Sequence, residues 1–271
     1  GTASPYSQVV AIDGVTQYSK IDLQPNAEQL SIFYEKDVAF LAENEDEMFM
    51  EDVIRAVLSR LDFAGKTVSI LGDSISTYKG YVPEGYACFY PYPSADVSDV
   101  NYTWWMRTIN KLGMTLLKNN SWSGSCVSSG TGASAAVNDS RLVELVKGTE
   151  RPDVIFIFMG ANDCGSSNVA LSTFQTSYKT MIDKIIALCP DAEIYLMTLP
   201  STGLYTESDR VLYNSVIRNY AEIYDLPLID LANLYTTTSY KDHVVDSCHP
   251  NNAGMIAISN AIVQELLKQV K

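Results

Sequence analysis

Three residues of this sequence could together activate a hydroxyl group for attack on a carbonyl carbon. Ser74 lies in SILGDSIS, directly after a short apolar run, and Asp246 precedes His249 in the segment DSCHP. A serine hydroxyl is a weak nucleophile unless a base removes its proton, and that base must be oriented by a third group. The pattern predicts Ser74 as nucleophile, His249 as acid and base, and Asp246 as the group that fixes the imidazole tautomer.

Attack on a carbonyl creates an oxyanion, which needs hydrogen-bond donors aimed at it. The candidates are the backbone N–H of Ser74, the backbone N–H of Gly124 in NNSWSG and the side-chain amide of Asn162 in GAND. A glycine at position 124 suits a loop whose backbone approaches a ligand closely, because no Cβ intervenes.

Each of these segments also has a purely structural interpretation. GDS after a strand is usually a turn capped by Asp or Ser, and GAND is by itself a turn sequence. An Asp-x-x-His segment before a helix could be a cap or a surface ion pair, and His243 also follows an aspartate. We favour His249 because the HVV segment at His243 indicates an extended piece with no third group at useful spacing. Four such signals in one chain order, each after a predicted strand, favour catalysis over four unrelated turns.

The elements that must position these residues alternate between strand and helix. Short apolar runs predict buried parallel strands at 67–71, 114–118, 153–159, 193–199 and 226–231. Helical spacing of apolar residues predicts helices over 104–112, 171–189, 211–220 and 255–266, with Met106, Val211 and Leu212 among the residues of their apolar faces. This alternation predicts a three-layer α/β fold with a flavodoxin-like parallel sheet of about five strands. Ligands bind such sheets at the carboxyl ends of the strands, where all four segments lie.

The character of the sequence changes near residue 46. Residues 1–45 carry scattered turn signals and short apolar pieces, which predicts an N-terminal extension or small β arm. Residues 46–271 form the predicted main domain, beginning with an amphipathic helix over 50–61.

The conjunction of segments resembles the SGNH (GDSL-type) hydrolase family, whose four blocks carry Ser, Gly, Asn and His. ILGDSIS matches the first block, NNSWSG the second, GAND the third and DSCHP the last, over residues 66–271. The first block reads Gly-Asp-Ser-Ile, without the Leu of the GDSL name. The resemblance implies a flavodoxin-like sheet, metal-free ester hydrolysis through an acyl-enzyme, and frequently acyl groups linked to carbohydrate. The Gly-x-Ser-x-Gly elbow of the α/β-hydrolase fold is a different motif, and GDSIS lacks its second glycine.

A long loop rich in aromatic residues follows Ser74. Tyr78, Tyr81, Tyr86 and the neighbouring Asp73 are candidate substrate contacts, because amphipathic rings could wall an acyl or sugar site. Phe89, Tyr90 and Tyr92 lie on the same loop. The alternative is that most of these rings pack the loop onto the body of the protein.

Composition limits the ligands and partners. Lys and Arg total 19 against 32 Asp and Glu, a net charge of -13, which disfavours nucleic acid and anionic lipid. With two histidines and no C-x-x-C pair, no metal or other cofactor is expected. The five cysteines are expected to be small buried hydrophobes, although a disulfide between two of Cys126, Cys164 and Cys248 would stiffen the rim of the site.

No apolar run reaches the ~18 to 20 residues that cross a bilayer, so no transmembrane segment is expected. The N-terminal GTASPYSQVV lacks the regions of a secretory signal. Export with the leader removed and a cytoplasmic location both stay open, as does the oligomeric state.

The sequence thus predicts a serine esterase that hydrolyses small acyl esters, foremost acetyl esters on a small molecule or glycan. A short-chain lipase or thioesterase is one alternative. A carbohydrate-binding or interaction module on the same fold is another, and a metal-dependent hydrolase is a poorer one because no ligand spacing is present.

Overall fold

A computed structural model describes the backbone of residues 9–12, 16–19, 62–128 and 134–269. The chain divides into two compact units, residues 1–63 with 267–271 and residues 64–266, each of which is described by itself. In the first, strands β1 (Val9–Ile12) and β2 (Thr16–Ser19) pair antiparallel. The predicted helix over 50–61 and most of the predicted arm over 1–45 lie outside the described residues.

The second unit is built on a parallel sheet of five strands in the order β4-β3-β5-β6-β7. The strands are β3 (Thr67–Gly72), β4 (Thr115–Ser121), β5 (Val154–Phe158), β6 (Glu193–Met197) and β7 (Leu228–Ile229). Every residue of β5 is buried, as expected of a continuous apolar strand that is covered on both faces. The strand order reverses at β3, which pairs with both β4 and β5, so the predicted flavodoxin-like α/β sheet is confirmed.

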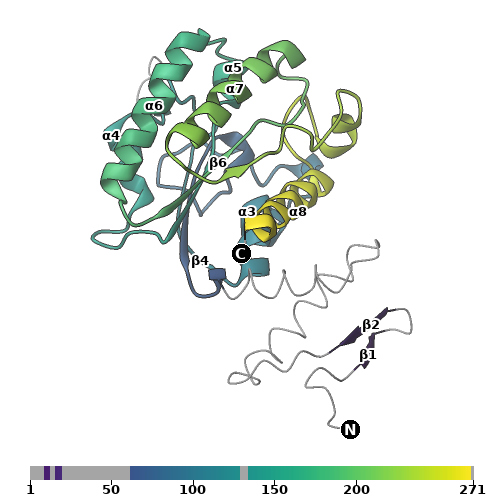
Figure 1. Ribbon diagram of the computed structural model, residues 1–271. Helices are drawn as coiled ribbons and strands as arrows, with labels where there is room; N and C mark the ends of the chain where they lie inside the picture. Colours follow the sequence, from purple (N-terminus) through teal and green to yellow (C-terminus); the bar gives the residue numbers. More distant parts are fainter. Residues whose placement is uncertain (1–8, 13–15, 20–61, 129–133, 270–271) are drawn as a thin grey trace. The chain divides into compact units, whose positions relative to one another are not determined.

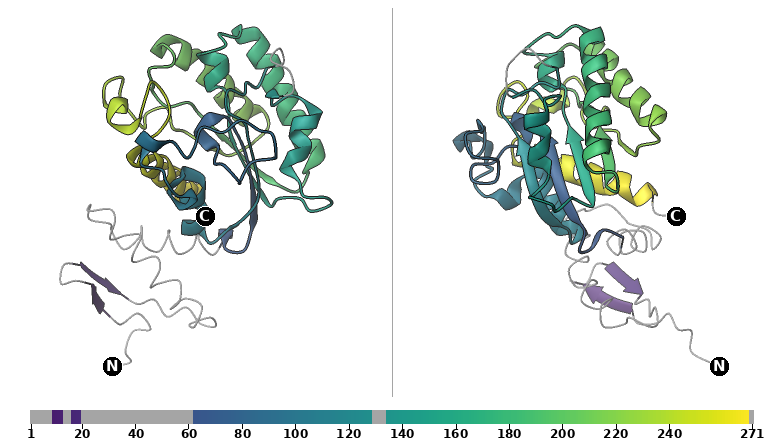
Figure 2. Two further views of the ribbon diagram at one scale, coloured as in Figure 1. Left: turned by 180° about the vertical axis from the view of Figure 1, so that it is seen from behind. Right: turned by 90° about the vertical axis from the view of Figure 1, so that its left-hand side faces the viewer.

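Helices cover both faces of this sheet (Figures 1 and 2). On one face lie α3 (Trp104–Leu112) and α8 (Asn252–Gln269), and on the other lie α4 (Asp139–Leu142), α6 (Leu171–Leu188) and α7 (Glu207–Ile223). The short α5 (Ala161–Cys164) follows β5 directly. The 3₁₀ helices are η1 (Ser74–Ser76), η2 (Pro93–Ala95), η3 (Val100–Tyr102), η5 (Val143–Leu145) and η6 (Ser239–His243).

Helix α3 shows why the sequence folds locally as predicted. The Thr103 side chain caps its first turn by accepting the Met106 N–H, and Gly113 ends it in the left-handed conformation. Trp104 and Trp105 are fully buried, whereas Met106 is only half-buried, so the predicted apolar face is shifted by one residue there.

Helix α7 corrects a second predicted face. Val211 and Leu212 are 52% and 49% exposed, while Arg210 and Asn214 lie on the buried side. Both buried polar side chains donate to the carbonyl oxygen of Leu199, just after β6. The buried side is therefore chosen by main-chain groups that need partners as well as by apolar area.

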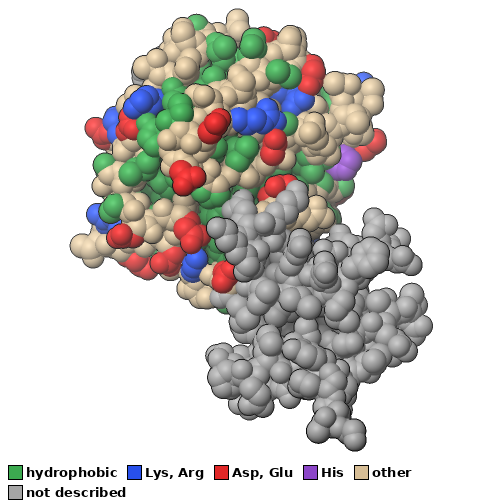
Figure 3. Space-filling view, in the orientation of Figure 1, with side chains coloured by type: hydrophobic (Ala, Val, Ile, Leu, Met, Phe, Trp, Pro, Cys, Tyr) green, Lys and Arg blue, Asp and Glu red, His purple; other side chains and the backbone are tan. Residues whose placement is uncertain are grey.

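Acidic side chains lie among basic ones on the described part of the face in Figure 3. Among the described helices, none combines the length and the hydrophobicity that crossing a membrane requires.

Candidate active site

Ser74 lies in a tight turn at the carboxyl end of β3, and its residue is 7% exposed. A Cβ at Gly72 would come within 2.6 Å of Ser76 Oγ and 2.8 Å of Ser121 Oγ, so only glycine fits where the strand passes these groups. The Asp73 carboxylate then caps η1 by accepting the Ile75 N–H at 3.0 Å. The GDS turn is thus a capped turn, and it also presents Ser74.

His249 and Asp246 complete a hydrogen-bonded chain that begins at Ser74. Ser74 Oγ lies 2.8 Å from His249 Nε2, and His249 Nδ1 lies 2.7 Å from Asp246 Oδ2. The distances suit the tautomer in which Nδ1–H donates to the carboxylate and Nε2 accepts from the serine hydroxyl. The competing His243 instead contacts the Ser239 carbonyl oxygen and stacks on a tyrosine ring.

The carboxylate of Asp246 is held by its own loop. Its Oδ1 accepts the N–H groups of Cys248 and His249, both at 2.8 Å. Partial burial alone would raise the pKa of Asp246, but these two hydrogen bonds and the imidazole outweigh it and lower the pKa below the usual value. Asp246 therefore stays an anion beside the imidazole over the whole neutral range.

The three predicted oxyanion donors follow β3, β4 and β5. Gly124 is exposed and adopts a φ of +79°, which favours glycine. Neither its N–H nor the N–H of Ser74 has an acceptor among the described residues. Asn162 donates one Nδ2 hydrogen to the Ser125 carbonyl at 2.9 Å, and its Oδ1 accepts from Ser166 Oγ at 2.8 Å. The second amide hydrogen of Asn162 has no acceptor among the described residues.

A buried carboxylate ties the second of these loops to the third. Asp163 is fully buried and accepts the N–H groups of Val127 at 2.8 Å and Ser128 at 3.0 Å. Burial raises the pKa of Asp163 in spite of these hydrogen bonds. Asp163 has no role among the predicted site residues, because GAND by itself indicates only a turn.

Phe89 covers one face of the His249 imidazole. The two rings are nearly parallel at 7°, with centroids 3.6 Å apart, and Tyr92 stacks on Phe89 at 4.8 Å. The Phe89 N–H donates to Thr77 Oγ1 at 2.9 Å, which fixes the aromatic loop to the Ser74 turn. Phe89 was predicted only as part of this loop, since no local pattern places it against a histidine 160 residues away.

The candidate substrate contacts lie in different environments. Asp73 is 2% exposed, and its pKa is raised to about 7, with burial as the largest cause. Tyr78 is 9% exposed and donates its hydroxyl to the Ser98 carbonyl at 2.8 Å. Tyr86 stacks on Trp122 with centroids 3.9 Å apart, whereas Tyr81 is 41% exposed. Of these four, Tyr81 presents the most surface to a ligand.

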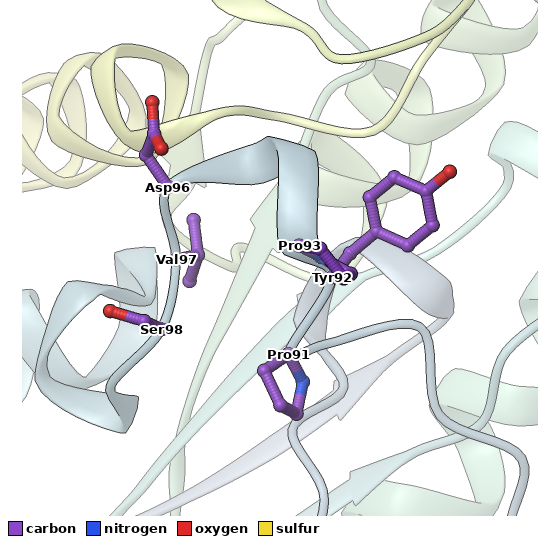
Figure 4. Close-up of a pocket in the computed structure, with 6 residues that line it drawn as sticks. All are labelled: Pro91, Tyr92, Pro93, Asp96, Val97 and Ser98. Carbon is purple, nitrogen blue, oxygen red and sulfur yellow. The ribbon is translucent and has the colours of Figure 1, made fainter.

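The same loop carries a hollow of about 330 Å³ at its outer turn (Figure 4). Its walls are Pro91, Tyr92, Pro93, Asp96, Val97 and Ser98. The ring of Tyr92 and the carboxylate of Asp96 extend to opposite sides of Pro93 in this view.

Three potential metal ligands meet at Asp246, Cys248 and His249, whose ligand atoms lie within 4.8 Å of one another. Two of these atoms are already paired in the Asp246–His249 hydrogen bond, and burial raises the pKa of the Cys248 thiol to about 12. All five cysteines, Cys126, Cys164 and Cys248 included, are free thiols in the structure.

Comparison with known proteins identifies the family. The family model of GDSL-like lipases and acylhydrolases matches residues 66–266. The chain belongs to this family. Among curated proteins, none is similar enough to count as a match.

Several solved structures share the fold of this chain. A protein from Bacteroides ovatus ATCC 8483, assigned as a GDSL-like lipase, is 28% identical with a TM-score of 0.59, over 76% of this chain and 99% of that one. A family two carbohydrate esterase from Clostridium thermocellum, in complex with cellohexaose, is 18% identical with a TM-score of 0.55, over 76% of this chain and 65% of that one. A carbohydrate esterase family 3 protein from Talaromyces cellulolyticus is 14% identical with a TM-score of 0.55, over 76% of this chain and 98% of that one. The last two likenesses concern the fold alone.

Proposed function

We propose that this GDSL-like protein is a serine esterase that removes small acyl groups, foremost acetyl, from carbohydrate through an acyl-enzyme. The observation that carries the proposal is the unbroken hydrogen-bonded chain from Ser74 Oγ through His249 to Asp246. A turn residue that only capped a helix would have no need of an oriented imidazole 2.8 Å from its hydroxyl.

In the first half of the reaction, Ser74 Oγ attacks the ester carbonyl carbon while His249 Nε2 takes the hydroxyl proton. The carbonyl π electrons move onto oxygen, and the oxyanion is bound by the N–H groups of Ser74 and Gly124 and by the Asn162 amide. The imidazolium, paired with Asp246, then protonates the departing alcohol oxygen as its bond to the acyl carbon breaks.

In the second half, water replaces the alcohol. His249 removes a proton from the water as its oxygen attacks the acyl carbon, and the same donors bind the second oxyanion. Collapse of this intermediate breaks the bond to Ser74 Oγ, which regains its proton from His249. The products are a carboxylic acid and free enzyme.

Two observations support carbohydrate as the alcohol portion. Tyr81 and Tyr92 are 41% and 43% exposed on the loop that packs beside Ser74 and His249, and such rings can stack on sugar faces. Carbohydrate esterases, one of them in complex with cellohexaose, are among the proteins that share the fold. The likeness to proteins assigned as lipases supports a short-chain lipase as the second candidate.

Covalent labelling tests the nucleophile. A fluorophosphonate probe should label wild-type protein at Ser74, located by peptide mapping, and should not label Ser74→Ala. His249→Ala should also abolish labelling. The matched variant His243→Ala should label normally, because the His243 ring is not part of the hydrogen-bonded series Ser74–His249–Asp246. A folded wild-type protein that takes no label would contradict the proposal and favour a binding module.

A substrate series tests the acyl group and the alcohol. The nitrophenyl esters of acetate, butyrate and octanoate should be hydrolysed in that order of decreasing kcat/KM, and acetylated oligosaccharide should release acetate. Preference for octanoate would favour the lipase alternative.

A further inference from the structure

Arg141 is a fully buried charged side chain that the proposed chemistry does not use directly. It lies in α4 and is 0% exposed. A guanidinium has five N–H donors, and here each has an acceptor. Nε donates to Asn120 Oδ1 at 2.6 Å, Nη1 to Ser125 Oγ at 2.8 Å and to the Ser134 carbonyl at 2.5 Å, and Nη2 to the carbonyls of Gly72 at 2.9 Å and Asn120 at 3.0 Å.

None of these five acceptors is a carboxylate, although buried arginines are usually paired with one. The rings of Tyr86 and Trp122 lie 5.3 Å and 5.9 Å from the guanidinium carbon and add cation–π attraction. Burial lowers the pKa of Arg141 to about 10, so the group stays charged at neutral pH. Its partners are main-chain and neutral side-chain oxygens, which makes it a connector between segments.

The segments it connects are those that carry the oxyanion donors. Gly72 is the last residue of β3 and leads into Ser74. Asn120 and Ser125 stand on either side of Gly124 in the chain. The Ser125 carbonyl in turn holds the Asn162 amide at 2.9 Å. One side chain thus contacts the chain two residues before Ser74 and on both sides of Gly124, and through Ser125 it is linked to the Asn162 side-chain amide.

We infer that Arg141 is a positioning residue that holds Ser74, Gly124 and Asn162 in the arrangement needed to bind the oxyanion, an inference that rests on the proposed function. Donors stabilise developing charge most when they are fixed before the reaction. The planar fork of arginine binds several acceptors at set separations, whereas lysine offers a single nitrogen that cannot reach both Gly72 and Ser125 in the same way.

The first test compares Arg141→Lys and Arg141→Met with wild type, using p-nitrophenyl acetate and the thermal unfolding midpoint. Loss of a positioning partner should lower kcat about 10- to 100-fold with little change in KM. The control Arg218→Lys changes a surface arginine that binds Asp230 at 2.9 Å, and it should leave both constants unchanged. A folded Arg141→Lys protein with wild-type kcat, or one altered only in KM, would overturn the inference.

A double variant separates positioning from general loss of stability. If Arg141 acts through the donors, Arg141→Lys should cost much less kcat in an Asn162→Ala background than in wild type. Losses that multiply instead would show that Arg141 does not act through the Asn162 amide, and would overturn that part of the inference.

Ser125→Ala covers the case in which the Arg141 variants do not fold. It removes one acceptor but keeps the carbonyl that holds Asn162, so kcat should fall about 3- to 10-fold, and again less in the Asn162→Ala background. A folded Ser125→Ala protein with unchanged kcat would count against the inference. If the wild-type protein hydrolyses no ester and is not labelled by fluorophosphonate, the proposed function fails, and the inference fails with it. If the wild-type protein is active but the variants at Arg141 and Ser125 keep its kcat, only the inference is refuted.

Discussion

Ser74 lies between two regions that are held in place by different means. On one side, the segments with Gly124 and Asn162 are held by hydrogen bonds to two fully buried side chains, Arg141 and Asp163. On the other side, the His249 side chain is 17% exposed and that of Asp246 is 43% exposed. There Phe89 stacks on the imidazole, and two N–H groups of the same loop bind the Asp246 carboxylate.

The difference fits the roles that the proposed mechanism gives to the two regions. Oxyanion donors exchange no proton, and hydrogen bonds in a low-dielectric interior are stronger and hold a fixed geometry. In the proposed mechanism the imidazole passes protons to an alcohol and from a water molecule, which requires access to solvent and freedom for small movements. The Phe89 ring, stacked on one face of the imidazole, limits its movement without blocking either nitrogen.

The largest effect on kcat should come from a substitution in the region that carries Gly124 and Asn162. Asn162→Ala removes a donor whose orientation two hydrogen bonds fix, so kcat should fall about 10²- to 10³-fold with a similar KM. Steady-state kinetics on p-nitrophenyl acetate measure this, with the exposed Asn101→Ala as the matched control. The same loss in both variants, or a loss that follows the unfolding midpoint, would contradict the comparison.

A smaller effect on kcat should come from a substitution in the region that carries His249 and Asp246. Phe89→Leu removes the ring face that contacts the imidazole and its charged form, so kcat should fall about 2- to 30-fold, because such contacts are worth about 0.5 to 2 kcal/mol. Phe89→Tyr keeps the ring and should stay close to wild type. Tyr102→Leu serves as control, because it makes the same replacement at an aromatic residue that is 41% exposed. A loss for Phe89→Leu as large as that for Asn162→Ala would mean that both sides depend equally on their supports.

The smallest effect on activity should come from Asp73→Asn, which sharpens the comparison through stability. Burial raises the pKa of Asp73 from 3.8 to about 7; the Ile75 N–H and the Arg141 charge lower it, whereas Asp163 adds to the rise. Between these two values the unfolded chain is ionised while the folded one keeps its proton, so wild-type stability falls as pH rises through that window. Asparagine has no such proton and can still accept the Ile75 N–H.

Thermal unfolding of the two proteins from about pH 4 to about pH 8 measures this effect. The midpoint of Asp73→Asn relative to wild type should rise with pH up to about 7 and then level off. A difference that is constant over the range would show that the Asp73 carboxyl group titrates normally.

Local patterns predicted most of the fold because each strand is a short apolar run with polar residues after it. The predicted 67–71 and 153–159 correspond to Thr67–Gly72 and Val154–Phe158, and only the last strand is markedly shorter than its apolar run. For α7 the predicted apolar face was wrong at Val211 and Leu212, although the predicted Ile217 and Tyr220 are buried. Arg210 and Asn214 are buried instead by their bonds to Leu199, a preference that hydrophobicity does not encode. The catalytic roles of Ser74, His249 and Asp246 stay predictions, now with a geometry that labelling can test.

By itself, the sequence determined the order of strands and helices and the polar residues that end each strand, since both depend on neighbours within a few positions. Tertiary structure alone decided what meets there: Ser74 and His249 are 175 residues apart in the chain, and Arg141 and Gly72 are 69 apart. Hydrogen bonds and ring stacking act over a few ångströms, so partners this distant in sequence meet only when the strands of the sheet bring their loops to one edge. The stack on His249 and the buried guanidinium beneath the donors therefore leave no local pattern to be found.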